Sequence, residues 1–336
     1  MPASSREPTL SSTGVGVLNR RAFAASLLPA LAACRGSRSK RIAVVPKANS
    51  HVFWVSVHAG AAAAGQKFGV EVLWNGPAQE IEYDRQMQIV DSMLAQHVDG
   101  LAVAATERKA LNRSLDRAAE LKIPVTVFDS GVDSTNYLSF IATNNYQGGQ
   151  MGARELARLV GGQGKVAMIM NIPGSLSTVD RERGFEDAIK SEFARIAIVA
   201  RQFSMSDRSK GMAAAENILT AHADLDGIFA SSEPSSTGAA LALKSRGLSG
   251  KVKCVGFDAS DNLIDDLKDG SIQTLVVQDP FRMGFEAVKT LVDKLNGITP
   301  PKQIDLPARV VTAGDLDKPE IRELLYPDVK KYLGSS

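Results

Sequence analysis

The side chains of this sequence that could do chemistry follow short apolar runs. A lysine, a histidine and two adjacent aromatic residues come after the first run, and carboxylate, hydroxyl or amide side chains come directly after several later ones. Such polar groups form hydrogen bonds with neighbouring hydroxyls, while aromatic faces cover the apolar face of a sugar ring. The set suits a neutral, polyhydroxylated ligand such as a sugar. The candidates are Lys47, His51, Phe53, Trp54, Asp129, Ser232, Asp258 and Gln278, with Glu233 beside Ser232 as a weaker one.

Composition and motifs exclude several classes of protein. The chain has 336 residues and a formal net charge of +2, and its basic residues are spread along its length, which gives no electrostatic footprint for nucleic acid. It contains neither a Gly-x-Gly-x-x-Gly nor a Gly-x-x-x-x-Gly-Lys-Ser/Thr pattern, so no nucleotide cofactor is expected. The two cysteines, Cys34 and Cys254, give no disulfide framework and no metal site, and we expect Cys254 to be a small buried apolar residue.

The elements that must position these side chains alternate regularly. Short apolar runs, typical of buried strands, are separated by segments whose apolar residues have helical spacing. This alternation predicts parallel sheets covered by helices on both faces. The apolar runs lie at 42–45, 70–74, 101–104, 125–128, 138–141, 166–170, 196–200, 228–230, 252–257 and 272–277. A helical segment separates the first two runs, and further helices are predicted near 81–96, 111–121, 147–160, 178–192, 209–221, 237–245 and 281–295.

The number of strands predicts two lobes. About ten strands are too many for one small domain. A weak internal repeat supports two similar halves, because residues 98–104 resemble 225–230 and residues 127–130 resemble 256–260. The predicted fold class is therefore α/β, with two doubly wound parallel-sheet lobes. Ligands of such sheets bind beyond the carboxyl ends of the strands, which is where the candidate residues lie.

The first 34 residues resemble an export signal. Asn19-Arg20-Arg21-Ala22-Phe23 precedes an apolar run, 24–33, that is too short to span a bilayer. Leu31-Ala32-Ala33-Cys34 resembles a bacterial lipobox, whose cysteine takes a diacylglyceryl group, and the paired arginines resemble a twin-arginine signal. We expect a lipid-anchored protein in the periplasm or on the outer face of the cytoplasmic membrane. The alternative is an ordinary apolar helix with a chance cysteine, and the secretory and twin-arginine routes both stay open.

Several segments together resemble the ribose-binding-protein family of periplasmic sugar receptors. They are Ile42-Ala43-Val44-Val45 with its downstream aromatic pair, Phe140 to Gly149, Arg181 to Phe185, and Val255 to Asp258, and the resemblance covers roughly residues 41–312. It implies the type I periplasmic binding protein fold. It also implies a non-enzymatic, cofactor-free solute-binding protein of an ABC transporter, which delivers a monosaccharide or similar polyol to a permease. A chemoreceptor is a further candidate partner.

The resemblance implies roles for individual residues. Aromatic residues would stack on the sugar ring, and polar side chains from both lobes would bind its hydroxyls. Lys47 replaces a serine of the ribose receptors, Ser130 an arginine and Ala104 an asparagine, so the ligand is not assumed to be ribose. The implied contacts are Lys47, His51, Phe53, Trp54 and Asp129 in the first lobe, and Asn145, Arg183, Ser232, Asp258 and Gln278 in the second lobe or at the hinge.

The family pattern also sets the expected division of the chain. A signal peptide (1–34) and a tether (35–41) would precede two discontinuous lobes, and the chain would cross between them near Thr143, Gln278 and Ala308. Short crossing segments can absorb changes in φ and ψ, so binding is expected to close the lobes about a hinge. The first lobe would comprise 41–142 and 279–307, the second 143–278 and 308–320, and a C-terminal tail 321–336.

Simpler roles stay open for most of these residues. Asp129 and Asp258 could cap following helices, Arg183 could form a surface ion pair, and the aromatic pair could belong to the core. Lys47 could be a solvated loop residue and His51 a local hydrogen-bond partner.

Other functions also stay open. Pro46-Lys47 also resembles receptors for furanosyl quorum signals. A glycoside hydrolase could use paired carboxylates, and a repressor of the lactose type shares the two-lobed core but needs a helix-turn-helix module where this chain has its export signal.

Overall fold

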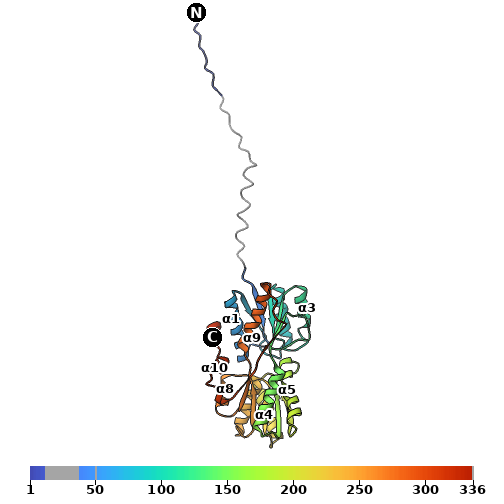
Figure 1. Ribbon diagram of the computed structural model, residues 1–336. Helices are drawn as coiled ribbons and strands as arrows, with labels where there is room; N and C mark the ends of the chain where they lie inside the picture. Colours follow the sequence, from blue (N-terminus) through green and yellow to red (C-terminus); the bar gives the residue numbers. More distant parts are fainter. Residues whose placement is uncertain (12–37, 50, 335–336) are drawn as a thin grey trace. The chain divides into compact units, whose positions relative to one another are not determined.

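Two six-stranded sheets form the frame of the protein, one in each of two lobes (Figure 1). The computed structural model describes residues 1–11, 38–49 and 51–334. All strands of the first sheet are parallel, and in the second only the edge strand β12 runs antiparallel to its neighbour. The predicted α/β class with two doubly wound lobes is confirmed. The first sheet has the order β11 (Gln303–Leu306), β5 (Ser139–Thr143), β4 (Val125–Phe128), β3 (Gly100–Val103), β1 (Arg41–Val45), β2 (Glu71–Trp74), and the second β12 (Arg309–Val311), β10 (Thr274–Val277), β9 (Lys253–Phe257), β8 (Gly227–Ala230), β6 (Gly164–Met170), β7 (Ile196–Phe203).

Helices cover both faces of each sheet, because successive residues of a buried strand point to opposite faces and both faces are apolar. In β1, Ile42 and Val44 pack in one cluster with α1 and α9, and Ala43 and Val45 pack in another with α2 and α3. In the second lobe, α6 and α7 cover the face that contains Cys254, and α4 and α5 cover the other. The helices are α1 (Val52–Phe68), α2 (Tyr83–Ala95), α3 (Asn112–Glu120), α4 (Asn145–Leu159), α5 (Leu176–Glu192), α6 (Arg208–Ala221), α7 (Glu233–Ser245), α8 (Asp261–Lys268), α9 (Pro280–Leu295), α10 (Pro319–Leu325) and α11 (Val329–Leu333).

Cys254 is wholly buried in the second core, as expected. Burial raises the pKa of its thiol to about 12, so it is an inert packing residue. Cys34 and most of the predicted export signal lie outside the described residues, and residues 1–11 form no helix or strand. Within the described part of the chain, no helix is long and apolar enough to cross a membrane.

The chain crosses between the sheets three times. It leaves the first sheet after β5, returns after β10 to form α9, and leaves again between β11 and β12. These places coincide with the expected crossings near Thr143, Gln278 and Ala308.

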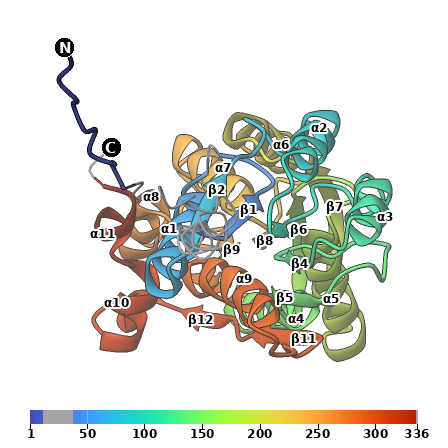
Figure 2. The ribbon, with the colours of Figure 1, turned by 90° about the horizontal axis from the view of Figure 1, so that it is seen from above.

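The C-terminal end differs from the expected tail. Ile321 of α10 is buried in the core of the second lobe, and α11 packs against α1 of the first lobe (Figure 2). The ring of Tyr332 lies 5.6 Å from that of Phe281 in α9. Helices this short carry too few apolar residues to give a detectable period, which explains why they were not predicted.

A close helix contact fixes the orientation of α5. A Cβ atom on Gly149 of α4 would lie 1.8 Å from the carbonyl oxygen of Arg181, and one on Gly184 would lie 2.0 Å from that of Tyr146. Only glycine permits this approach of two helix backbones. The contact holds α5 with the Arg181 side chain directed toward the cavity described next.

Candidate functional site

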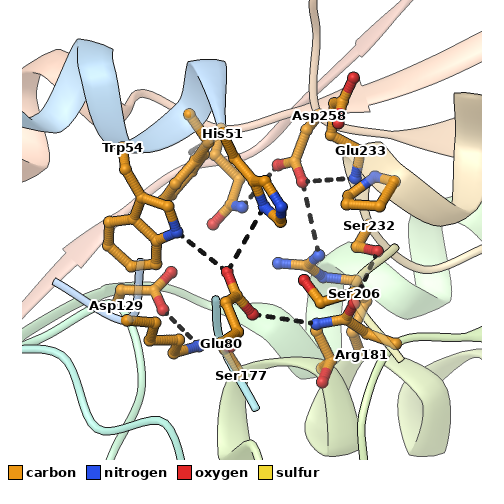
Figure 3. Close-up of a pocket in the computed structure, with 16 residues that line it drawn as sticks. His51, Trp54, Glu80, Asp129, Ser177, Arg181, Ser206, Ser232, Glu233 and Asp258 are labelled. Atoms are coloured by element: carbon orange, nitrogen blue, oxygen red, sulfur yellow. Dashed lines mark hydrogen bonds and ion pairs between the residues drawn. The ribbon is translucent and has the colours of Figure 1, made fainter. Parts of the chain in front are cut away.

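A cavity with about 390 Å³ of space lies beyond the carboxyl ends of strands from both sheets (Figure 3). Figure 3 shows Trp54 and Asp129 on one side of the cavity and Arg181 and Ser206 on the other. The predicted residues that line it are Lys47, His51, Phe53, Trp54, Asp129, Ser232, Asp258 and Gln278.

A buried ion pair lies at the first-lobe side of the cavity. Lys47 Nζ is 2.6 Å from Asp129 Oδ2, and neither side chain is more than 4% exposed. Lys47 Nζ also donates to the hydroxyls of Ser175 and Ser177, both at 3.0 Å and both in the second lobe. The alternative of a solvated loop lysine is therefore wrong. The Ser177 backbone N–H in turn donates to Ser130 Oγ, so the lobes touch directly here.

An aromatic wall comes from the start of α1. Trp54 is buried, and its indole N–H donates to Glu80 Oε1 at 2.9 Å. Phe53 meets it edge to face, with ring centroids 5.0 Å apart, and both line the cavity although they are adjacent in one helix. Trp54 also belongs to the first-lobe core, so its binding and core roles coincide. His51, just before α1, has Nδ1 3.8 Å from Glu80 Oε1.

The prediction for Arg183 needs correction. Arg183 lies on the surface, where its side chain is 61% exposed and pairs with Asp180, as the simpler alternative proposed. Arg181 lines the cavity instead. Two residues along a helix correspond to a rotation of about 200°, so these arginines face opposite sides of α5. The family motif contains both, and only the helix orientation distinguishes them.

Arg181 is a wholly buried cation with several partners. Its Nη2 donates to Asn145 Oδ1 at 2.7 Å, and its Nη1 donates to the carbonyl oxygen of Ser231. The guanidinium lies 3.4 Å from the centre of the Phe257 ring and 4.0 Å from Asp258 Oδ2. Burial lowers the pKa of Arg181, and the surrounding carboxylates oppose that shift. Asn145 thus orients the Arg181 side chain through this hydrogen bond and does not itself line the cavity.

Asp258 accepts hydrogen bonds from two other segments of the second lobe. Its Oδ1 accepts from Gln278 Nε2 at 2.7 Å, and its Oδ2 accepts from the backbone N–H of Glu233 at 3.1 Å. Burial raises the pKa of Asp258, against the charge of Arg181. The capping alternative is wrong here, because Ser260 caps α8.

Asp129 and Asp258 occupy equivalent places in the two lobes. Each follows the corresponding strand, β4 or β9, and each has a left-handed backbone, with φ of 58° and 69°. The repeat seen in the sequence is therefore a structural repeat. Aspartate tolerates this conformation better than most residues, and strained backbone clusters at ligand sites.

A buried glutamate supports the second-lobe side. Glu182 Oε1 accepts from the backbone N–H of Asn171 and from the Ser231 hydroxyl. Burial raises its pKa to about 7. In turn, the Ser232 hydroxyl donates to Asn171 Oδ1 at 3.1 Å, which orients both polar side chains at the cavity. In the described residues no group of side chains could hold a metal ion.

Comparison with known proteins decides the family. Residues 42–299 match the periplasmic binding protein domain. The chain belongs to this family. The ribose import binding protein RbsB of Bacillus subtilis is 27% identical over 260 residues, which cover 77% of this chain and 83% of that protein. A D-ribose/D-allose-binding protein of Pseudomonas aeruginosa is 28% identical over 285 residues, which cover 81% and 89%.

Solved structures of solute-binding proteins support the same family assignment. A carbohydrate transporter solute-binding protein from Agrobacterium radiobacter, in complex with D-arabinose, superposes with a TM-score of 0.84 and 32% identity, covering 86% of this chain and all of that one. An ABC transporter solute-binding protein from Agrobacterium vitis with bound D-fucose gives 0.83 and 34%, covering 85% and 100%. The predicted ribose-binding-protein family and non-enzymatic class are confirmed, and family membership implies export.

Several cavity residues of this periplasmic binding protein were not predicted. Glu80, Asn171 and Ser206 lie in loops and the others lie in α5 or α7, in polar segments where nothing in the sequence distinguishes a side chain that faces a cavity from one that faces solvent. Glu80 follows a proline-containing turn in the loop between β2 and α2, and Ser206 lies in the loop between β7 and α6. Glu233, the weaker candidate beside Ser232, also lines the cavity, and the residues missed are Glu80, Asn171, Ser177, Thr178, Arg181, Ser206 and Pro234.

Proposed function

We propose that this protein captures a monosaccharide or similar small polyol in the interlobe cavity and delivers it to the permease of an ABC transporter. The main observation for the proposal is that a single cavity is lined both by an aromatic wall and by hydrogen-bonding side chains from the two lobes. Charged groups that are already oriented bind hydroxyls strongly, and the aromatic face takes the apolar side of the ring.

The sugars bound in related structures support a monosaccharide as the ligand. Related structures hold D-arabinose, α-D-tagatopyranose and D-fucose, each in a protein of this fold. A furanosyl quorum signal is the second candidate, since the buried Lys47–Asp129 pair is part of the site and the ribose receptors carry a serine at the lysine position. Titration calorimetry with D-ribose, D-allose, D-arabinose, D-fucose and D-tagatose tests the proposal. We expect micromolar or tighter binding of at least one sugar; no binding of any would contradict it.

Lobe closure gives a further prediction. Phe53, Trp54 and Asp129 belong to the first lobe, and Arg181 and Asp258 to the second, so a ligand reaches all of them only when the lobes are together. It therefore binds the closed form better and shifts the population toward it. Small-angle scattering should show a smaller radius of gyration with saturating sugar. An unchanged curve at proven saturation would mean a rigid pocket.

A lipid anchor at Cys34 completes the proposed function. The residues Leu31-Ala32-Ala33 before it match the small-residue pattern of a lipobox. Wild type should fractionate with membranes, and Cys34→Ser should be released to the soluble fraction. Cys254→Ser is the matched control, because that buried thiol is not expected to affect anchoring. Equal release of wild type and Cys34→Ser would exclude the anchor.

A further inference from the structure

Glu80 is a buried carboxylate that reaches across the cavity. It comes from the loop between β2 and α2 of the first lobe and is 7% exposed. Its Oε1 is taken by the Trp54 indole N–H, whereas its Oε2 has only a long contact of 3.4 Å, from Asn171 Nδ2 of the second lobe. Oε2 therefore retains acceptor capacity toward the cavity.

The surroundings of Glu80 favour its ionised form despite its burial. Burial by itself raises the pKa of the carboxyl, but the nearby Lys47 and His51, the hydrogen bond from Trp54 and the proximity of the Ser206 hydroxyl outweigh this, and the pKa is lowered. An ionised carboxylate only accepts hydrogen bonds. A ligand group placed against Oε2 must therefore be a donor, such as a hydroxyl, and not a ring oxygen.

Ser206 faces Glu80 from the second lobe on a strained turn. Met205 and Ser206 both have left-handed backbones, with φ of 55° and 54°, although neither is glycine. Consecutive residues in this region are energetically costly and persist where the surrounding structure requires them. The Ser206 side chain is buried, lines the cavity and lies close enough to Glu80 to help lower its pKa, yet its Oγ makes no hydrogen bond of normal geometry within the described chain.

We propose that Glu80 and Ser206 form a polar subsite that binds one ligand hydroxyl from opposite lobes and so selects among stereoisomers of the sugar. The carboxylate accepts a hydrogen bond from the ligand hydroxyl, and the serine hydroxyl donates one to the oxygen of that group, so both its donor and its acceptor function are satisfied. The inference rests on the proposed sugar-binding function. A sugar with its hydroxyl absent or inverted leaves the buried carboxylate and serine unpaired, which is the basis of strong discrimination.

Three variants distinguish a ligand contact at Glu80 and Ser206 from a purely structural role of these residues. Glu80→Gln keeps the side-chain shape and an oxygen acceptor for Trp54, so it preserves the aromatic wall but removes the charge. Glu82→Gln, two residues along the same loop and outside the cavity, is the matched control. Ser206→Gly removes the hydroxyl from a backbone that glycine adopts readily, so its melting temperature should be unchanged or higher.

The experiment measures affinity by calorimetry, first for the sugar of the panel that wild type binds best and then for each monodeoxy analogue of that sugar. We expect Glu80→Gln to weaken binding of the parent sugar about tenfold and Ser206→Gly about threefold to tenfold, with Glu82→Gln unchanged. For one analogue, which lacks the hydroxyl held by the pair, both losses should fall below about twofold, because the lost partner is already absent.

The outcomes separate the two proposals. A wild-type protein that binds no sugar would overturn both of them. Binding by wild type with unchanged affinity in both variants would overturn the subsite alone. Equal losses for the parent sugar and for every analogue would assign Glu80 and Ser206 a structural role only, and would also overturn it.

Discussion

Replacing Arg181 by alanine should reduce the free energy of unfolding by about 3–5 kcal/mol, because the change leaves a buried carboxylate at Asp258 without its cation. It also removes the partners of Asn145 and of the Ser231 carbonyl. Sugar affinity should fall at least about tenfold to a hundredfold, as expected when a charge-assisted hydrogen bond is lost. Denaturant unfolding and calorimetry measure the two effects.

Arg183→Ala is the matched control, two residues away on the same helix. Its exposed side chain predicts a change in stability within about 0.5 kcal/mol and unchanged affinity. If Arg181→Ala does not fold, Arg181→Lys retains the charge without the planar fork and should fold with weakened binding. Weaker binding in Arg183→Ala than in the Arg181 variant would restore the original sequence-based assignment.

Breaking the Lys47–Asp129 pair should be the second large effect. Lys47→Met leaves a buried aspartate and Asp129→Asn leaves a buried lysine, so each should destabilise the fold by about 3–5 kcal/mol. Asparagine suits position 129 because it tolerates the left-handed backbone. Each single variant should also weaken sugar binding at least about tenfold.

The double variant Lys47→Met/Asp129→Asn distinguishes stability from binding. It leaves neither charge unpaired, so unfolding measurements should show much of the lost stability recovered. Its sugar affinity should stay low, because the lysine donor is gone and the acceptor at position 129 is no longer charged. Recovery of affinity together with stability would mean that the pair supports the fold and does not contact the ligand.

The two lobes were predictable because their strands and long helices repeat a strong apolar pattern. Runs such as Ile42 to Val45 are apolar on both faces, which happens only in sheets covered on both sides. The elements that were missed are short. The helix α8 has eight residues, and β11 and β12 have four and three, of which only the last residue of each strand is buried. Such segments gain their structure from the sheet edge or the core that they join, and the local sequence does not show it.

The candidate site was predictable where a side chain directly follows a strand. Asp129 and Asp258 were found because the strand ends of an open sheet converge on its ligand site. Arg181 and Glu80 could not be chosen in this way. The first needs the rotational setting of α5, which the glycine contact with α4 fixes, and the second needs the path of a polar loop over the end of the sheet.

The late return of the chain to both sheets affects how the nascent protein can fold. The first sheet lacks its edge strand until residues 303–306 have been synthesised and can pair with residues 140–143. The second sheet lacks its antiparallel edge until residues 309–311 follow. Although domains often fold one after another during synthesis, here the strands that complete both sheets are synthesised last, after most of both lobes. A chain interrupted between residues 278 and 302 would leave β5 and β10 as unpaired edges of their sheets, and open edges of this kind promote aggregation.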